Sequence, residues 1–296
     1  MLLRRLFATK AVKMAILPAD EIPPLSLLYK LGKLSPPPTD TKIPTTLSFA
    51  GPGLITPSKA LNDRVSLVRH DITTLGVDAI TNAANRRLLG GGGIDGAIHN
   101  GAGPGLLKEC RTLNGCDTGD AKITDAYNLP CKKVIHAVGP IYDGDEPEKS
   151  EKLLTSCYNK VLDLAVQNDC KTLALCGIST GIYGYPPRKA APVAMSAVRK
   201  FLESEKGQKL EKVVFVTWIK PDIDSHAEFL PIYFPPVEED AKEASAAESK
   251  IETEQAAEAE EIASKLPDVP HSEPKSEAKP EPGEGEPPEK KQKYDE

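Results

Sequence analysis

Short runs of β-branched and other apolar residues alternate with longer amphipathic stretches through the middle of the chain. Gly, Asp or Pro bounds each of the short runs, which predict strands at residues 65–68, 79–82, 133–138, 172–176 and 212–218. The amphipathic stretches predict helices at 95–102, 105–113, 151–167, 190–206 and near 223–230. This alternation predicts an α/β fold, a three-layer α/β/α sandwich around a mixed central sheet.

Both ends of the 296-residue chain differ in composition from this middle, which divides the chain into three parts. Residues 62–236 form the predicted folded domain. Residues 237–296 are rich in Glu, Ala, Lys and Pro and contain a single aromatic residue, Tyr294. Such a segment buries too little apolar surface to offset its chain entropy, so we predict a disordered acidic tail. The negative net charge of −6 comes from this tail and therefore says little about the folded part.

Residues 1–61 form a predicted N-terminal extension, which begins with a basic segment and continues as a Pro-rich arm. Arg4, Arg5, Lys10 and Lys13 precede the first acidic residue, a pattern typical of a mitochondrial presequence. An ordinary basic tail is the alternative, since acid-poor starts also arise by chance. We therefore expect a mitochondrial or a cytoplasmic and nuclear location.

Cysteine usage and hydropathy exclude several classes of protein. Six cysteines are scattered through the folded part: Cys110, Cys116, Cys131, Cys157, Cys170 and Cys176. They form no CxxC pair, so the sequence supports neither a disulfide framework nor a zinc site. No stretch reaches the roughly 20 apolar residues that a membrane span needs. We expect a soluble intracellular protein with reduced thiols, no metal and no membrane partner.

A glycine run separates one predicted strand from the following helix and consists of Gly90, Gly91, Gly92 and Gly93. Glycine gives up side-chain packing and raises the entropy lost on folding, so this run indicates that the backbone approaches another group very closely. Glycine N–H groups in a concave turn before a helix N-terminus form a nest that binds anions. We predict a phosphate site here, with Asn82, Asn85 and Asp95 beside it.

A second glycine-rich segment, at residues 177–186, follows a later strand. Because it also leads into a helix, it predicts another anion nest. Sheets of this kind bind ligands at the carboxyl ends of their strands, where both segments and the dipeptide His70-Asp71 are expected. Two nests in one crevice suit a pyrophosphate.

Each of these elements also has a plainer interpretation. Glycine runs occur in mobile linkers, Asp95 is suited to cap a helix, and Asn82 and Asn85 are suited to form turns. Three ring-bearing residues are interpreted as packing residues rather than catalysts: His99, His136 and Trp218. The glycine run matches neither a P-loop nor a dinucleotide-binding finger, which argues against a nucleoside triphosphatase.

Four strings of the folded part match the motifs of one known family. They are Asp71-Ile-Thr73, Val77-Asp-Ala-Ile-Thr-Asn82-Ala-Ala-Asn85, Leu88-Leu-Gly-Gly-Gly-Gly-Ile-Asp95-Gly-Ala-Ile-His99 and Ile178-Ser-Thr-Gly-Ile-Tyr183-Gly-Tyr-Pro186. In combination they resemble the macrodomain family, specifically its MacroD-type branch of mono-ADP-ribosyl-protein hydrolases. The resemblance spans residues 62–236 and leaves both ends of the chain unexplained.

The resemblance implies that ADP-ribose lies across the crevice, with adenine at one end and the distal ribose at the other. Asp71 would accept the adenine amine, with the Ile72 N–H nearby. Trp218 would pack on the adenine ring, where the branch usually has Phe. Backbone N–H groups of two loops would wrap the diphosphate: Gly90, Gly91, Gly92, Gly93 and Ile94 in one, and Ser179, Thr180, Gly181, Ile182 and Tyr183 in the other.

Asn82, Asn85, Asp95 and Tyr183 would surround the distal ribose, and the resemblance implies that the first three are catalytic. An acidic side chain joined to the anomeric carbon is an activated ester, so its cleavage needs a positioned water and no metal or redox cofactor. Asp95 would orient or deprotonate that water, while Asn85 would hold the ribose hydroxyls. A phosphate of the substrate is the alternative base.

The implied activity is removal of mono-ADP-ribose from acidic side chains of proteins, together with deacetylation of O-acetyl-ADP-ribose, by a monomer. Serine-linked ADP-ribose has a poor leaving group and is expected to be a poor substrate. A non-catalytic reader of ADP-ribosylated proteins is the alternative, although Asp95, Asn85 and the intact glycine run favour turnover. No nucleic-acid partner is expected, because the folded part has no basic strip with interleaved aromatics.

Overall fold

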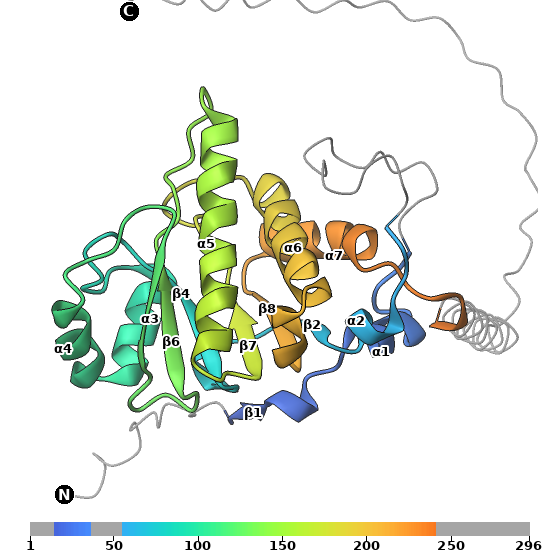
Figure 1. Cartoon of the computed structure of the whole chain (residues 1–296), viewed down its shortest axis with the longest axis horizontal. Coiled ribbons are helices and arrows are strands. Elements are labelled where there is room, and N and C mark those ends of the chain that lie inside the picture. The colour runs from blue at the N-terminus through green and yellow to red at the C-terminus, as the bar shows by residue number, and fades with distance from the viewer. Residues whose placement is uncertain (1–14, 37–54, 241–296) are drawn as a thin grey trace, which may run out of the picture. The chain divides into compact units, whose positions relative to one another are not determined.

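Six strands form the central sheet of the computed structural model, which describes residues 15–36 and 55–240 (Figure 1). In spatial order they are β2 (Val65–Arg69), β8 (Lys212–Thr217), β7 (Thr172–Leu175), β4 (Ala79–Ala83), β6 (Lys133–Ala137) and β5 (Ala121–Asp125). Neighbouring strands run parallel from β2 to β6, whereas β5 runs antiparallel to β6. The mixed sheet predicted from the sequence is confirmed.

The predicted strands end within one residue of their observed ends, but the sequence does not predict β5. This strand reads Ala-Lys-Ile-Thr-Asp and lies at the edge of the sheet. It contains only two β-branched residues, so no apolar run distinguishes it from a loop. β5 forms a strand because it pairs with β6 in the folded domain, and its own sequence pattern does not indicate this.

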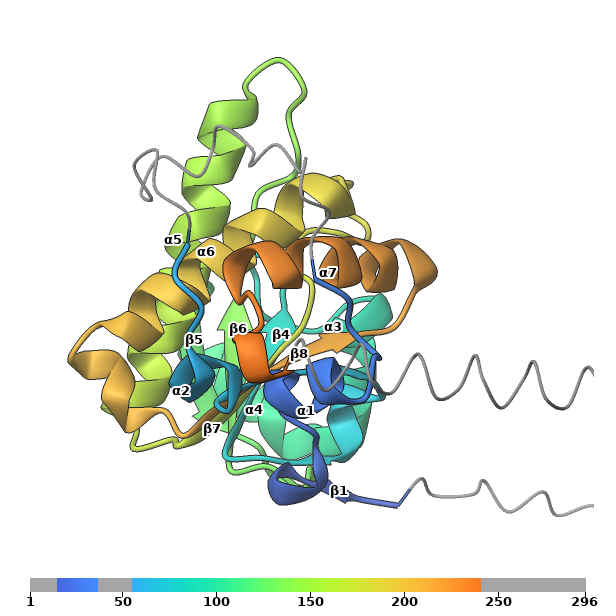
Figure 2. The same cartoon turned by 90° about the vertical axis from the view of Figure 1, so that its right-hand side faces the viewer.

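Helices cover both faces of the sheet and complete three layers (Figure 1 and Figure 2). One core includes α5 (Pro147–Gln167), α6 (Pro187–Glu203) and α7 (Lys220–Tyr233), and the other includes α3 (Gly93–Ala102) and α4 (Pro104–Thr112). Side chains of β8 alternate between the cores: Val213 and Phe215 join the first, and Val214 and Val216 the second. The three-layer prediction is confirmed.

The predicted helices all occur, and they begin a few residues earlier than predicted. In α4, α5, α6 and α7 a proline occupies the first turn, and the prediction starts each helix after it. Proline is favoured there because its missing N–H would have no partner inside the helix. Helix α6 ends at Glu203 and is followed by η3 (Lys206–Lys209).

Residues 15–36 pack against this domain, although the sequence assigns them to an extension. β1 (Leu17–Pro18) pairs with β3 (Leu75–Gly76), which follows η2 (Ile72–Thr74). After η1 (Ala19–Glu21), α1 (Leu25–Lys30) lies beside α2 (Lys59–Asn62). Leu25 is fully buried, and the hydroxyl of Tyr29 donates to the carbonyl of Phe234 at 2.8 Å. This segment therefore contributes to the core.

The other predictions for the chain ends lie outside the described residues. These are the presequence at 1–14 and the part of the acidic tail beyond Asp240. The prediction of a disordered tail from residue 237 is wrong for residues 237–240, because they are ordered and Asp240 is fully buried and pairs with Lys30 at 3.7 Å. Among the described helices, none combines the length and the apolar character that a bilayer span requires. All six cysteines are buried and unbridged.

We expect Leu25→Ala to lower the free energy of unfolding by ~2–5 kcal/mol, because it opens a cavity in a closely packed core. Urea denaturation of the full chain measures the change. Leu31→Ala is the matched control: Leu31 lies six positions later and is 54% exposed, so its effect should stay within ~0.5 kcal/mol. Equal effects of the two exchanges would show that the segment does not belong to the core.

Candidate active site

A cavity of about 570 Å³ opens at the carboxyl ends of the parallel strands. Each strand from β2 to β6 contributes residues from the loop that follows it, including Asp71, Asn85, Gly139, Gly177 and Trp218. The volume is typical of a small-molecule site. The expected convergence of polar and glycine-rich loops in one crevice is present.

Most of the predicted site residues line this cavity: Asp71, Ile72, Asn85, Gly91, Gly92, Gly93, Ile94, Asp95, Ser179, Thr180, Gly181, Ile182, Tyr183 and Trp218. Asn82 and Gly90 do not. Asn82 is fully buried and donates a hydrogen bond to Asp95. Gly90 turns the loop at a φ of 82°, and its carbonyl accepts a hydrogen bond from Asn85. Both residues therefore support the wall without forming it.

The first glycine loop leads directly into α3. Gly90 and Gly93 have φ values of 82° and 59°, in the left-handed region that favours glycine. A Cβ on Gly91 would lie 3.1 Å from Asp95 Oδ2 and 3.4 Å from Asn85 Nδ2, so glycine lets the loop lie against both side chains. The first N–H groups of a helix have no partner inside it, and here Gly93 and Ile94 of that first turn line the cavity. This geometry suits an anion.

The second loop is strained at Ser179, a residue other than glycine with a φ of 68°. Strain of this kind persists where the surroundings enforce it, commonly at ligand sites. Ser179 is 6% exposed and its Oγ has no hydrogen-bond partner among the described residues. It lies against Gly139, where an added Cβ would overlap Ser179 Oγ and lie 2.6 Å from Ile178 Cγ2. The loop and the end of β6 therefore fit together only without a side chain at position 139.

Asp95 is a carboxylate of the cavity wall that is surrounded by polar side chains. Its Oδ1 accepts a hydrogen bond from Asn82 Nδ2 at 2.8 Å, and its Oδ2 lies 3.4 Å from Asn85 Nδ2. His99 Nε2 is 3.5 Å from Asp95 Oδ1. Helix α3 has Gly92 at its N-cap and no side-chain capping bond, so the plainer interpretation of Asp95 as a helix cap is wrong. Asn85 does form a turn, since its Oδ1 accepts from Arg87 N at 3.0 Å.

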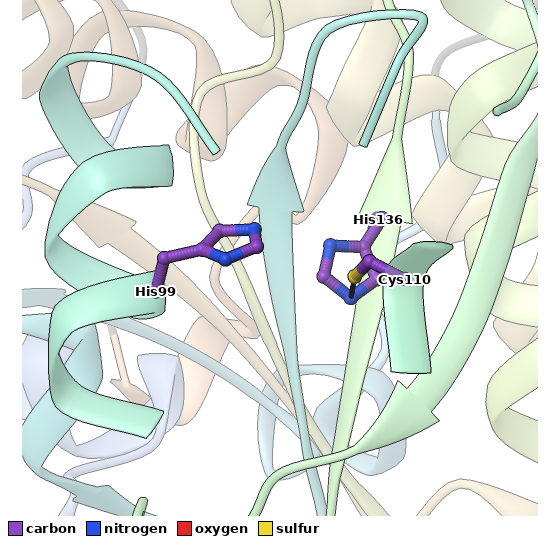
Figure 3. Close-up of side chains that lie close together, drawn as sticks. All are labelled: His99, Cys110 and His136. Atoms are coloured by element: carbon purple, nitrogen blue, oxygen red, sulfur yellow. Dashed lines mark hydrogen bonds between the residues drawn. The ribbon is translucent and has the colours of Figure 1, made fainter. Parts of the chain in front are cut away.

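The three residues interpreted as packing residues, His99, His136 and Trp218, differ in how far they are buried. Trp218 is 62% exposed and lines the cavity, so that interpretation is wrong for Trp218. His136 is fully buried, and the His99 side chain is 10% exposed. Figure 3 shows His99, Cys110 and His136 pointing toward one another from α3, α4 and β6. Their ligand atoms lie within 4.8 Å of one another, a grouping the scattered sequence positions do not reveal.

Gly139 and Asp222 are among the residues of the cavity wall that are absent from the prediction. Gly139 lies two residues after the end of β6, in a stretch whose sequence gives no signal for a contact with the second loop. Asp222, in the first turn of α7, faces the cavity beside Thr180. Burial raises the pKa of the Asp222 carboxyl, and a hydrogen bond with Thr180 opposes that shift. Only the fold brings α7 to this loop.

Comparisons with known proteins match the same part of the chain. A family model described as Macro domain matches residues 81–194. The chain is 50% identical to the ADP-ribose glycohydrolase MACROD2 of Xenopus laevis over 176 residues, which make up 60% of this chain and 42% of that protein. It is 51% identical to a macro domain-containing protein of Chlorobaculum tepidum over 169 residues, 57% of this chain and 96% of that protein.

A crystal structure of a Trypanosoma brucei macrodomain in complex with ADP-ribose is similar, with a TM-score of 0.58 and 34% sequence identity. That match covers 73% of this chain and 77% of the other. The vertebrate relative is longer than the shared region, since the match spans 42% of MACROD2.

Proposed function

Since the chain belongs to the macrodomain family, we propose that it binds ADP-ribose in this cavity and hydrolyses its ester bond to acidic side chains of proteins. The observation that carries the proposal is the Asp95 carboxylate, which lines the same cavity as two loops suited to a diphosphate. The name ADP-ribose glycohydrolase, borne by a relative with 50% identity, supports the same activity. The same site accepts O-acetyl-ADP-ribose, which has an equivalent ester.

The diphosphate binds to backbone N–H groups of the two loops. Its negative charge is stabilised by the N-terminus of α3 and by the turn at Ser179, because such groups carry partial positive charge. Neither loop requires Lys or Arg for this purpose.

Adenine binds at the end of the cavity formed after β2 and β8. Asp71 Oδ1 accepts hydrogen bonds from Thr73 N and Thr73 Oγ1 at 2.9 and 2.7 Å, which holds the carboxylate steady to accept the adenine amine. The exposed indole of Trp218 packs on the face of the base.

The distal ribose then lies beside Asn85 and Asp95. Asn85 holds the ribose hydroxyls. Asp95 orients a water and accepts its proton while the water oxygen bonds to the anomeric carbon and the bond from that carbon to the carboxylate oxygen breaks. The carboxylic acid leaves as a stabilised carboxylate, so it needs little assistance. A serine-linked substrate lacks this leaving group and is cleaved poorly.

Release of free ADP-ribose tests the proposal. The full chain is incubated with one protein carrying ADP-ribose on glutamate and another carrying it on serine, and chromatography follows free ADP-ribose. We expect release from the glutamate-linked substrate only. Tight binding of both substrates without release would instead identify a non-catalytic reader.

We expect Trp218→Ala to weaken ADP-ribose binding by about 10- to 100-fold, because stacking of an aromatic side chain on a base contributes ~1–3 kcal/mol. Calorimetric titration of the full chain measures the affinity. Trp218→Phe keeps a stacking ring and should bind nearly as well as the wild type. Since Trp218 is 62% exposed, neither exchange should alter the unfolding free energy much. Unchanged affinity in the alanine variant would remove Trp218 from the site.

A further inference from the structure

We propose that His136 is a positioning residue, whose Nδ1 orients the amide of Asn82 so that Asn82 in turn fixes the Asp95 carboxylate at the cavity wall. The proposal rests on the proposed function, in which Asp95 acts on the water. His136 itself is fully buried and is not among the residues that line the cavity.

A chain of hydrogen bonds connects the four side chains concerned. Asn82 Nδ2 lies 2.8 Å from Asp95 Oδ1 and 3.0 Å from His136 Nδ1. The opposite ring nitrogen, His136 Nε2, lies 2.9 Å from Thr124 Oγ1. One amide nitrogen carries two protons, and here each has its own acceptor.

The direction of each hydrogen bond follows from the carboxylate. Asp95 accepts, so the atom of Asn82 beside it is the N–H donor. The second proton of that nitrogen then points to His136 Nδ1, which must accept and cannot carry a proton. His136 Nε2 therefore holds the ring proton and donates to Thr124. Burial, with a smaller contribution from the charge of His99, lowers the pKa of His136 to about 3, so the ring stays neutral at neutral pH.

Sheet pairing sets this arrangement. Asn82 and His136 are direct partners in the parallel pairing of β4 with β6. Thr124 lies on β5, which pairs antiparallel with β6. The supporting residues thus belong to three hydrogen-bonded strands, whereas Asp95 follows a glycine loop that has no side chains to hold it. A carboxylate that must orient water benefits from such a rigid support.

Loss of the acceptor His136 Nδ1 would disturb Asn82 directly. Its Oδ1 is buried without a hydrogen-bond partner among the described residues, so the two N–H bonds alone decide how the amide is turned. Without the Nδ1 acceptor, one amide proton would also be unsatisfied in a buried site, which is unfavourable. The amide is then free to rotate away from Asp95.

A metal ion held by His99, Cys110 and His136 is the competing interpretation of the cluster in Figure 3. Cys110 Sγ is 3.7 Å from His136 Nε2, a distance compatible with shared coordination. A metal-ligating histidine, however, donates its other ring N–H to a carboxylate, a carbonyl or water. His136 Nδ1 faces an N–H donor instead, which leaves the proton on Nε2 and no lone pair for a metal.

Two exchanges at position 136 separate the two ring nitrogens. His136→Asn retains an acceptor near the Nδ1 position, and His136→Gln retains a donor near the Nε2 position but lacks the acceptor for Asn82. In the full chain we expect His136→Gln to lower kcat by about 10- to 100-fold, a loss typical of a displaced reacting group, with KM and the affinity for ADP-ribose little changed. His136→Asn should retain kcat close to that of the wild type. Equal losses in both variants, or no loss in either, would overturn the proposal.

Nitrogen NMR of the full-length wild-type chain gives a second readout that does not depend on activity. The chain has five histidines, and the signal of His136 is identified as the one missing from His136→Asn or, if that variant does not fold, as a signal shifted in Cys110→Ser. We expect a protonated Nε2 and an unprotonated Nδ1 for His136 at neutral pH, unchanged by added zinc. The opposite tautomer, or a zinc ion bound at His136, would overturn the proposal. A wild-type chain with the expected tautomer that releases no ADP-ribose would contradict the proposed function alone.

Discussion

Asp95→Asn is expected to lower kcat for release of ADP-ribose from glutamate-linked substrate by ~10²- to 10⁴-fold, the usual contribution of a positioned general base. The amide has nearly the shape of the carboxylate, and its oxygen can still accept from Asn82. It cannot accept a proton from water at neutral pH. Initial rates measured over a range of substrate concentrations separate kcat from KM.

Affinity distinguishes a chemical effect from a structural one in this variant. The Asp95 carboxylate is 2.8 Å from Asn82 and lies within a support that the amide can keep, so the affinity for ADP-ribose should change little. Asp117→Asn is the matched control, because Asp117 is exposed on the surface and pairs with Arg86 outside the cavity. A variant Asp95→Asn that keeps full kcat would assign the base to a phosphate of the substrate.

Gly139→Ala is expected to weaken ADP-ribose binding by about 10- to 100-fold. The new Cβ would overlap Ser179 Oγ and lie 2.6 Å from Ile178 Cγ2, so the second loop has to move. Overpacking costs ~1–3 kcal/mol, and roughly 1.4 kcal/mol corresponds to a tenfold change in affinity. Calorimetric titration with ADP-ribose measures the loss, and thermal unfolding reports how much of the cost is shared with stability.

Gly144→Ala controls for the exchange itself. Gly144 lies five positions further along the same loop, and an added Cβ there would have no atom within 4 Å. Its affinity for ADP-ribose should equal that of the wild type. If Gly139→Ala binds as tightly as Gly144→Ala, the contact between the end of β6 and the second loop is not needed for the site.

The sequence predicts the parallel strands well because their apolar runs are bounded by turn residues. Val213 to Val216 of β8 face two cores in alternation, and such a run is unmistakable. The sequence does not predict β5 or α1, because neither forms a bounded apolar run. β5 is a short edge strand. The buried residues of α1, among them Leu25 and Tyr29, lie in a Pro-rich part of the sequence, and their burial depends on contacts with residues far along the chain.

The candidate site is predictable wherever a loop follows a strand directly. The sequence places Asn85, the glycine run and Ser179 in the site because each follows a parallel strand, and the carboxyl ends of parallel strands meet at one edge of the sheet. Asp222 and the contact of Gly139 with Ser179 are not, since they depend on how α7 and the end of β6 pack. The same holds for His136, whose contact with Asn82 exists only in the pairing of β4 with β6.

The central claim is that two glycine-rich loops form one binding site for ADP-ribose. Calorimetric titration of the full wild-type chain with ADP-ribose tests it most directly. The account predicts saturable binding with one molecule of ADP-ribose per chain, weakened by Gly139→Ala and retained by Asp95→Asn. Absence of binding to the correctly folded wild-type chain would contradict it.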